Sequence, residues 1–226
     1  MAELLKKIKI LINFSYRRRR LDNDLKQNTR YFQGKILDIG GGRQRGSFYP
    51  VTKNQKKWII ADIDKRKAPD IVANVEKLPF KDRQFDSIKA TELFEHVYSP
   101  EKGMKECLRV LKKGGYFVFS IPFMAPIHSD PYDYQRLTEQ KLKKYFRELK
   151  NNKIMEFKHQ GYMFSVFADM LKGWIRTWPL LLRWPAYGLT LPFLEFIVYL
   201  ESFEFVKKNK FIASFPAGYF AIFQKK

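Results

Sequence analysis

The segment that most constrains the fold is KILDIGGGRQRG, residues 35–46, in which an apolar run ends in an acid and glycines follow at once. A buried strand that ends in a glycine turn carries its loop to the carboxyl edge of a parallel sheet, where α/β proteins bind ligands. Because glycines have no Cβ atom, the backbone there can approach a ligand closely. The segment therefore predicts a nucleotide-like ligand at the end of this strand.

The spacing of the glycines excludes two common phosphate-binding loops. The dinucleotide pattern G-x-G-x-x-G fits at Gly40 and Gly42 but fails at its last position, which is Arg45. The Gly-Lys-Ser/Thr sequence of a P-loop is absent. A second apolar run, WIIADID, brings in Asp62, whose carboxylate can accept both hydroxyl groups of a ribose. The pattern predicts a nucleoside cofactor without a bound pyrophosphate.

Short apolar runs alternate with helical and loop stretches, which is typical of an α/β protein whose parallel sheet is covered by helices on both faces. We predict helices at 101–113 and at 138–149, the latter with Thr138 as its N-cap. The predicted strands are 35–40, 58–64, 70–75, 85–90, 114–122, 153–161 and 217–226.

The predicted organisation has four parts. They are a basic amphipathic N-terminal helical segment (1–33), a core (34–161), an aromatic-rich helical insertion (162–210) and a final core strand (211–226). Within the insertion, the apolar run 189–200 is too short to span a bilayer. We expect the insertion to be either an interfacial, lid-like element or an ordinary buried helical subdomain.

The chain is strongly basic, with 43 Lys and Arg residues against 23 Asp and Glu residues and a formal net charge of +20. Such a surface attracts nucleic acid or an anionic membrane. The arginine run Arg17–Arg20 follows apolar residues at helical spacing, which predicts a helix that either lies on a membrane or packs on the domain. Those apolar residues are Leu4, Leu5, Ile8, Leu11 and Ile12.

The single cysteine and the N-terminal sequence bear on the compartment. Cys107 has no partner for an internal disulfide, which is compatible with a reducing cytosol. Lysines interrupt the apolar residues at the N-terminus, and no small-residue cleavage site follows, so we expect no signal peptide. We predict a cytoplasmic protein, with peripheral membrane association as an open option.

Four segments resemble, in order and spacing, the motifs of class I S-adenosylmethionine-dependent methyltransferases of the type 11 group. The match covers about residues 34 to 138 and implies S-adenosylmethionine as the cofactor. It also implies a Rossmann-like, mostly parallel seven-stranded sheet with an antiparallel last strand. The C-terminal helical insertion before that strand is expected from the sequence pattern itself. The segments are ILDIGGG, IIADID, NVEKLPFKDRQFDSI and ELFEHVYSPEKGMKECLRVLKKGGYFVFSIP.

The resemblance implies which residues contact the cofactor. Gly40 and Gly42 would let the backbone approach the methionine portion, and Asp38 would hold its ammonium group directly or through water. Asp62 would bind the ribose hydroxyls. Asn74 and Val75 would border the adenine, and Thr91 and Glu92 would lie near the methionine end.

Two features depart from the family pattern. Asn74 stands where the family has an acid, but its amide oxygen can still accept a hydrogen bond from an amino group. The segments RQRGSFYP and KRKAPD are shorter than the helices usually found there, so we expect a less enclosed cofactor.

A candidate acceptor segment, HSDPYDYQRLT, follows the predicted fifth strand at the carboxyl edge. His128 is the candidate general base, because histidine is the side chain best suited to proton removal near neutral pH. Asp133, Tyr134 and Arg136 are candidates for positioning the acceptor. The alternative is a loop held by its own hydrogen bonds, with an internal ion pair between Asp133 and Arg136. The segment resembles one in methyltransferases of cell-surface glycan gene clusters.

The remaining histidines do not suggest a metal centre. His96, His128 and His159 are far apart in the sequence and lack ligand spacing, so we expect no metal site. We expect His96 to cap and pack the helix that follows it.

The sequence thus predicts methyl transfer to a small or lipid-linked, glycan-related acceptor, at a hydroxyl group and at an anionic membrane surface. An RNA methyltransferase is one alternative, although no appended RNA-binding motif is present. A noncatalytic cofactor-binding partner domain is the other. The acceptor atom and the oligomeric state are left open.

Overall fold

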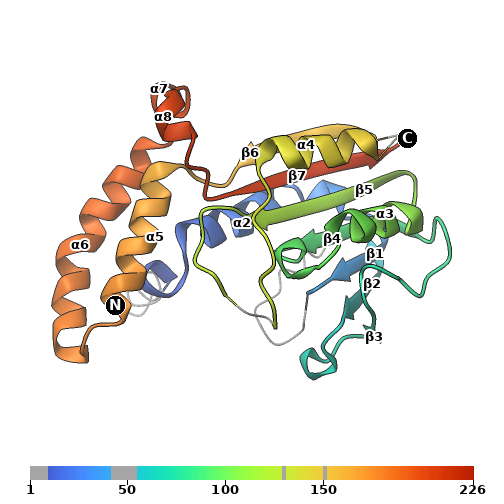
Figure 1. Cartoon of the computed structure of the whole chain (residues 1–226), viewed down its shortest axis with the longest axis horizontal. Coiled ribbons are helices and arrows are strands. Elements are labelled where there is room, and N and C mark those ends of the chain that lie inside the picture. The colour runs from blue at the N-terminus through green and yellow to red at the C-terminus, as the bar shows by residue number, and fades with distance from the viewer. Residues whose placement is uncertain (1–9, 42–54, 129–130, 150–151) are drawn as a thin grey trace. The chain divides into compact units, whose positions relative to one another are not determined.

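The fold is that of a computed structural model, which describes residues 10–41, 55–128, 131–149 and 152–226 (Figure 1). The chain forms two compact units. One combines residues 1–22 with 159–218, and the other combines 23–158 with 219–226. The boundary between them falls within helix α2 (Tyr16–Gln27), so the predicted N-terminal segment is divided between the units.

Among the described residues, seven strands form one sheet in the order β3-β2-β1-β4-β5-β7-β6. Strand β1 pairs in parallel with β2 and β4, β2 with β3, and β4 with β5. In Figure 1, β7 runs opposite to β5, so the predicted α/β class and the reversed last strand are confirmed. The strands are β1 (Gly34–Ile39), β2 (Gln55–Asp62), β3 (Ile71–Val72), β4 (Phe85–Thr91), β5 (Leu111–Pro122), β6 (Asn152–His159) and β7 (Gly218–Lys225).

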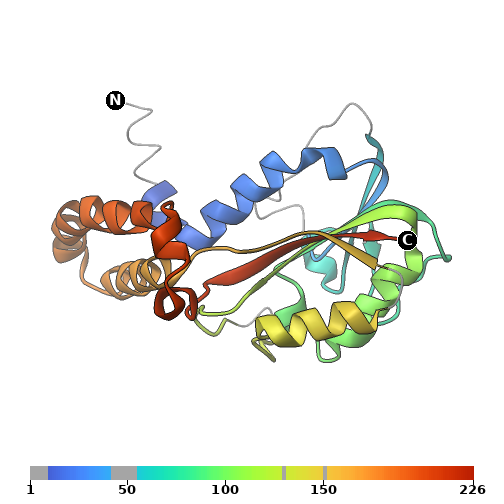
Figure 2. The same cartoon turned by 90° about the horizontal axis from the view of Figure 1, so that it is seen from above.

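Helices cover the sheet on both faces. Figure 2 shows α3 (Pro100–Val110) and α4 (Glu139–Glu148) on one face and the C-terminal part of α2 on the other. The hydroxyl oxygen of Thr138 accepts a hydrogen bond from the backbone N–H of Lys141, which confirms Thr138 as the N-cap of α4. Three single-turn 3-10 helices complete this unit, namely η1 (Thr29–Tyr31), η2 (Lys65–Lys67) and η3 (Phe94–His96).

The junction between α3 and β5 differs from the prediction. The helix was expected to continue to residue 113, but it ends at Val110, and Leu111 already has extended backbone angles. Leu111 is fully buried and pairs with Phe85, so the gain from burying its side chain in the sheet outweighs another helical residue. The register then shifts before Ser87 pairs with Tyr116, and the intervening glycines accommodate this irregularity.

An aromatic core holds the central strands. Phe94, Phe117 and Phe119 are fully or almost fully buried and contact one another through their rings. Phe146 of α4 stacks on Phe223 of β7 with ring centroids 3.8 Å apart. Close packing of these large side chains fixes β5 and β7 relative to η3 and α4 and therefore fixes the loops at the ends of these strands.

The other unit is helical and contains the predicted insertion. Its elements are α5 (Met163–Arg176), α6 (Leu180–Leu200), α7 (Glu204–Lys207) and α8 (Lys210–Ala213). Residues 10–22 belong to the same unit, where Ile12 is buried with Ile175, Tyr187 and Leu191. Of the two readings of the N-terminal segment, the packed helix is the one found for residues 10–22, whereas Leu4, Leu5 and Ile8 lie outside the described residues.

Two arginines of the basic run pair with acids of the insertion. Arg19 contacts both carboxylate oxygens of Glu195, at 2.7 and 3.3 Å, and Arg20 lies 2.8 Å from Glu201. These pairs neutralise part of the positive charge within the unit. No helix in the described part of the chain is both long enough and apolar enough to cross a bilayer.

Candidate cofactor and acceptor site

The glycine turn after β1 is built on a buried ion pair. Asp38 and Lys89 are paired positions of the parallel strands β1 and β4, and the Lys89 Nζ lies 3.0 and 2.9 Å from the two carboxylate oxygens of Asp38. Burial raises the pKa of Asp38, whereas the Lys89 ammonium opposes that rise. Sequence reasoning missed Lys89, although a lysine inside an otherwise apolar strand was a visible signal.

The same carboxylate explains why the turn needs glycine. A Cβ atom added at Gly41 would lie 2.4–2.5 Å from the carboxyl group of Asp38. Gly40 has a φ of +76°, which favours glycine over other residues. The Asp38 carboxyl group therefore packs against the turn at Gly41. Its contact with the cofactor's ammonium group stays a prediction. Gly42, the other predicted cofactor residue of this turn, lies outside the described residues.

Asp62 lies at the end of β2 and is almost fully buried. Its Oδ1 accepts a hydrogen bond from the backbone N–H of Asp64 at 2.9 Å. Its Oδ2 is buried and accepts no hydrogen bond within the described part of the chain, and the Lys67 Nζ lies 3.6 Å from it. A buried carboxylate oxygen in this state can accept a hydroxyl donor, as the predicted ribose contact requires.

Asn74 and Val75, which the resemblance places beside the adenine, have side chains that are already engaged within the protein. The Asn74 side-chain oxygen accepts a hydrogen bond from the backbone N–H of Glu76 at 2.8 Å, so the turn already uses that acceptor. The Val75 side chain is buried, and a Cβ atom at Gly103 would approach it to 3.2 Å. Any contact of Val75 with the adenine would therefore come from its backbone.

Thr91 and Glu92 lie at the carboxyl end of β4, as expected. Glu92 has a φ of +54°, an uncommon backbone conformation for a residue with a side chain. The backbone N–H of Glu92 donates to the carbonyl of Ser120, and the Ser120 hydroxyl donates to the Glu92 carboxylate at 2.8 Å. These bonds tie the end of β4 to β5. Strained residues of this kind occur often at functional sites.

The loop after β5 is fastened to η3 by backbone and side-chain hydrogen bonds. The backbone N–H of Tyr134 donates to the carbonyl of Glu95 at 2.8 Å. The Gln135 amide donates to the carbonyls of Phe94 and Val97 at 3.1 and 2.8 Å. Gln135 was not predicted as a site residue, because a single glutamine in a loop gives no sequence signal.

Asp133 and Arg136 bind each other. Both guanidinium nitrogens of Arg136 contact the Asp133 carboxylate, which also accepts a hydrogen bond from the backbone N–H of His128 at 2.9 Å. Arg136 lowers the pKa of Asp133 to about 2. These contacts agree with the alternative of a loop held by its own hydrogen bonds. A role of Asp133, Tyr134 or Arg136 in positioning the acceptor stays a prediction.

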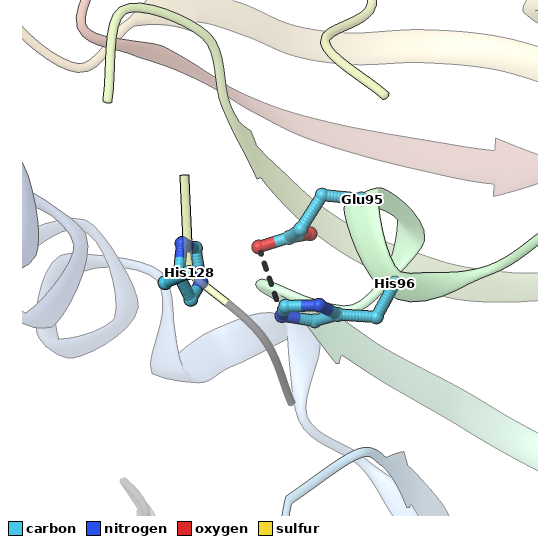
Figure 3. A group of neighbouring side chains, drawn as sticks. All are labelled: Glu95, His96 and His128. Carbon is cyan, nitrogen blue, oxygen red and sulfur yellow. Dashed lines mark ion pairs between the residues drawn. The ribbon is translucent and has the colours of Figure 1, made fainter. Parts of the chain in front are cut away.

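His128 and His96 are brought together, because their segments follow the neighbouring strands β4 and β5. Their ring centroids are 5.0 Å apart, and the His96 Nε2 lies 3.7 Å from the Glu95 carboxylate (Figure 3). The expectation that His96 caps the next helix is wrong, since the N-cap of α3 is Ser99 and the His96 Nδ1 contacts the Tyr132 carbonyl. Its expected packing on that helix stays a prediction. Sequence distance did not indicate this cluster.

The residues present fit a nucleoside-type cofactor. The buried Asp62 Oδ2 offers a hydroxyl acceptor, and the Gly41 position offers a turn that a side chain would block. Both lie at the carboxyl ends of adjacent strands, β1 and β2, at the edge of the sheet where such ligands bind. The short η2 replaces a longer helix after β2, as the sequence predicted.

Sequence comparisons identify relatives of this domain. A family model described as a methyltransferase domain matches residues 37–119. The ubiquinone/menaquinone biosynthesis C-methyltransferase UbiE of Vibrio campbellii is 33% identical over 120 residues, covering 44% of this chain and 46% of that protein. An uncharacterised protein of Methanocaldococcus jannaschii is 32% identical over 98 residues, covering 43% of this chain and 48% of that protein. The chain spans about half the length of these curated relatives.

Solved structures support the fold. A SAM-dependent methyltransferase from Archaeoglobus fulgidus superposes with a TM-score of 0.52 and 17% identity, covering 96% of this chain and 97% of that chain. The cyclase SpnF superposes with a TM-score of 0.60 and 16% identity, covering 91% of this chain and 80% of that chain. At these identities the likeness concerns the fold alone.

Strand order, the glycine turn and the buried carboxylate at the end of β2 define a Rossmann-like domain that binds a nucleoside cofactor. The family match identifies residues 37–119 as a methyltransferase domain. With the matches above, this domain is similar to class I S-adenosylmethionine-dependent methyltransferases, which implies S-adenosylmethionine as the cofactor.

Proposed function

We propose that this protein transfers a methyl group from S-adenosylmethionine to a hydroxyl of a small or lipid-linked, glycan-related acceptor at an anionic membrane surface. The observation that carries the proposal is the shared carboxyl edge of β1, β2, β4 and β5. The predicted cofactor residues lie at the carboxyl ends of β1, β2 and β4, and His128 lies in the loop after β5.

The chemistry asks little of the protein beyond alignment and proton removal. The cofactor supplies an activated methyl group, so the protein has to orient the acceptor and exclude water. A hydroxyl acceptor must also lose its proton. The Nδ1 of His128 lies 3.2 Å from the carbonyl of Pro126, which can only accept a hydrogen bond. The Nδ1 therefore carries a proton in that contact, and the Nε2 is the nitrogen that can act as a base.

Aromatic side chains near His128 support an amphiphilic acceptor. Tyr98, Tyr132 and Tyr134 are exposed, and their rings contact one another at centroid distances of 5.6 and 5.4 Å. Tyrosine offers an apolar ring face together with a polar hydroxyl. This combination suits a sugar or a lipid-linked sugar, which presents both kinds of surface.

Exposed apolar residues of α5 and α6 support the membrane surface. Leu181 and Leu189 are 87% and 82% exposed, and large exposed apolar patches in soluble proteins mark interaction sites. The net charge of +20 favours an anionic bilayer over a neutral one as the occupant. The other strongly exposed apolar residues are Phe167, Met170, Trp174, Leu180, Leu182, Trp184, Phe193, Phe196 and Tyr199.

The two alternatives have weaker support. The RNA alternative rests on the net charge of +20, and the sequence has no appended RNA-binding motif. No observation favours the noncatalytic cofactor-binding domain over an enzyme, because both would use the glycine turn and Asp62 to hold the cofactor. The RNA alternative gives a distinct result in the experiment that follows, and the label-partition assay at the end of the Discussion tests the noncatalytic alternative.

Flotation with lipid vesicles tests the membrane part of the proposal. We expect the protein to float with vesicles that contain phosphatidylglycerol and to stay behind with neutral phosphatidylcholine. The double variant Leu181→Ser/Leu189→Ser should lose flotation about tenfold or more, because burial of each leucine contributes about 1.5–3 kcal/mol. The control Val72→Ser/Ile154→Ser removes two exposed apolar side chains of the other unit and should float normally.

Two results would overturn the membrane proposal. One is equal flotation of both double variants. The other is failure to float combined with a shift of tRNA in a native gel, which would favour the RNA alternative.

A further inference from the structure

We infer that Glu95, His96 and His128 form a binding site for a divalent transition-metal ion of the Zn²⁺ type. The ligand atoms of the three side chains all lie within 4.8 Å of one another (Figure 3). Metal binding goes beyond the proposed methyl transfer and does not depend on it. Only the use suggested below, in which the ion holds the acceptor, rests on the proposed function.

The distances suit a site that closes on an ion by a small movement. Metal–ligand bonds of roughly 2.0–2.2 Å in a tetrahedral sphere place neighbouring ligand atoms roughly 3.4 Å apart. The His96 Nε2 and the Glu95 carboxylate are already 3.7 Å apart. The His128 side chain is 47% exposed, so its ring can move the remaining distance at little cost.

Hydrogen bonds at the opposite ring nitrogens favour the metal-binding tautomers. The His96 Nδ1 lies 2.5 Å from the carbonyl of Tyr132, and the His128 Nδ1 lies 3.2 Å from the carbonyl of Pro126. Because carbonyls only accept hydrogen bonds, each Nδ1 carries a proton, and each neutral ring keeps its lone pair on Nε2. Metal-ligating histidines almost always donate their other ring N–H in this way.

Charge also calls for a cation at this position. The Glu95 carboxylate is fully buried, and the His96 Nε2 faces it at 3.7 Å. Two electron-rich groups at this distance repel each other unless a proton or a metal ion lies between them. The inference is that a metal ion takes this position when such ions are supplied.

Burial falls across the three ligands, from Glu95 at the base to His128 at the solvent side. The His96 side chain is 12% exposed, between the other two. An ion held here would therefore have protein on one side and an open coordination position on the other. Three protein ligands with an open position, including the His₂Glu set, are typical of catalytic rather than structural zinc sites.

The backbone around the ligands is held firmly enough for a preformed site. The Tyr134 N–H bond to the Glu95 carbonyl and the two Gln135 bonds fasten the loop after β5 to η3. The site thus lies on a rigid part of the carboxyl edge. In the proposed reaction, an ion there would hold an acceptor's hydroxyl oxygen and favour its deprotonated form. The ion would then replace His128 as the group that promotes proton loss, because a coordinated Nε2 cannot also accept a proton.

The test is zinc binding by tag-free, full-length protein that has first been treated with a chelator and dialysed. Isothermal titration with ZnCl₂, followed by elemental analysis after dialysis, should give one ion per chain. His96→Ala and His128→Ala should each weaken zinc binding by about tenfold to a hundredfold. His159→Ala removes the remaining histidine, which lies outside the cluster, and should bind zinc like the unchanged protein.

A second readout separates loss of the site from loss of the fold. Cobalt added to the chelated protein should give the visible absorption bands of a tetrahedral ion, and His128→Ala should lose them while its thermal unfolding midpoint is kept. Absence of stoichiometric zinc, or zinc bound equally by the His96→Ala/His128→Ala double variant, would overturn the inference.

Measuring methyl transfer beside zinc binding separates a failure of the metal inference from a failure of the proposed function. If zinc does not bind but His128→Ala abolishes transfer, the metal inference fails and His128 as base stands. If zinc binds normally and no acceptor is methylated, the proposed function fails and the metal site stands.

Discussion

The ammonium nitrogen of Lys89 bridges both carboxylate oxygens of Asp38 at 2.9 and 3.0 Å, and both side chains are buried. The two residues are paired positions of β1 and β4, so strand register brings them together. Asp38 in turn lies directly behind Gly41. Asp38, the acid of the first motif, is thus a structural support for the turn that is predicted to bind the cofactor, and the Lys89 ammonium already balances its charge.

Removal of Lys89 should destabilise the protein strongly. Lys89→Met leaves the buried Asp38 carboxylate without its counter-charge, and breaking a buried pair in this way costs about 3–5 kcal/mol. Urea unfolding at neutral pH measures this loss. The double variant Asp38→Asn/Lys89→Met, which removes both charges, should recover most of the free energy of unfolding. A loss below about 1 kcal/mol in the single variant would contradict the assigned pair.

Gly41→Ala should impair cofactor binding. The new Cβ would lie 2.4–2.5 Å from the Asp38 carboxyl group, so the turn or the buried pair must shift. We expect the affinity for S-adenosylhomocysteine to fall at least tenfold, equivalent to about 1.4 kcal/mol. Gly173→Ala is the matched control, because a Cβ at that helical position meets nothing within 4 Å. Unchanged affinity of Gly41→Ala would show that the turn is not close to the ligand.

Asp62→Ala should weaken cofactor binding through the loss of one acceptor group, without the shift of the turn that Gly41→Ala causes. Its buried Oδ2 is the acceptor assigned to the ribose hydroxyls, and hydrogen bonds to a charged group contribute about 1.5–3 kcal/mol, or roughly tenfold to a hundredfold in affinity. Asp64→Ala serves as control, because its partly buried carboxylate is already paired with Arg66. Isothermal titration with S-adenosylhomocysteine measures both, and equal effects of the two variants would remove the ribose assignment.

Lys172 makes the stability of the helical unit depend on pH. Its Nζ donates to the carbonyl of Phe14, and burial lowers its pKa from 10.5 to about 8. Asp169 and Glu195 oppose this shift, while Arg19 and Arg176 add to it. The folded protein releases the proton near pH 8, but the unfolded chain keeps it to about pH 10.5, so stability from this group rises with pH between these values.

Urea unfolding of the unchanged protein and of Lys172→Met between pH 7.5 and about 9.5 checks this dependence. As the pH rises, the free energy of unfolding of the unchanged protein should increase relative to that of Lys172→Met. The upper limit avoids the range in which tyrosines titrate in the unfolded chain. A difference that stays constant with pH would contradict the lowered pKa of Lys172.

Most of the fold could be predicted from local sequence. Apolar runs that end at glycine or acid marked the strands, because buried parallel strands require continuous apolar residues. The end of α3 could not be predicted, since Leu111 leaves the helix only to pair with Phe85, a contact distant in sequence. Lys89 is similar: a lysine in an apolar strand is visible in the sequence, but Asp38 can be identified as its partner only when the strand register is known.

The candidate site could be predicted only in part. Residues of motifs, such as Asp62 and Glu92, lie at the strand ends where the resemblance expected them. The pairing of His96 with His128 depends on which strands are neighbours, and sequence separation hid it. For Asp133 and Arg136 the sequence offered two readings, and only the contacts between them favour a self-supporting loop.

The most direct test of the central claim is a label-partition assay. The protein and methyl-labelled S-adenosylmethionine are incubated with a host lysate that includes membranes, and the products are separated into organic, aqueous and RNA fractions. We predict that label enters the organic fraction and that it falls together with vesicle binding in Leu181→Ser/Leu189→Ser. Label in RNA, or no label above that of Asp62→Ala in any fraction, would contradict methyl transfer to a lipid-linked acceptor at a membrane.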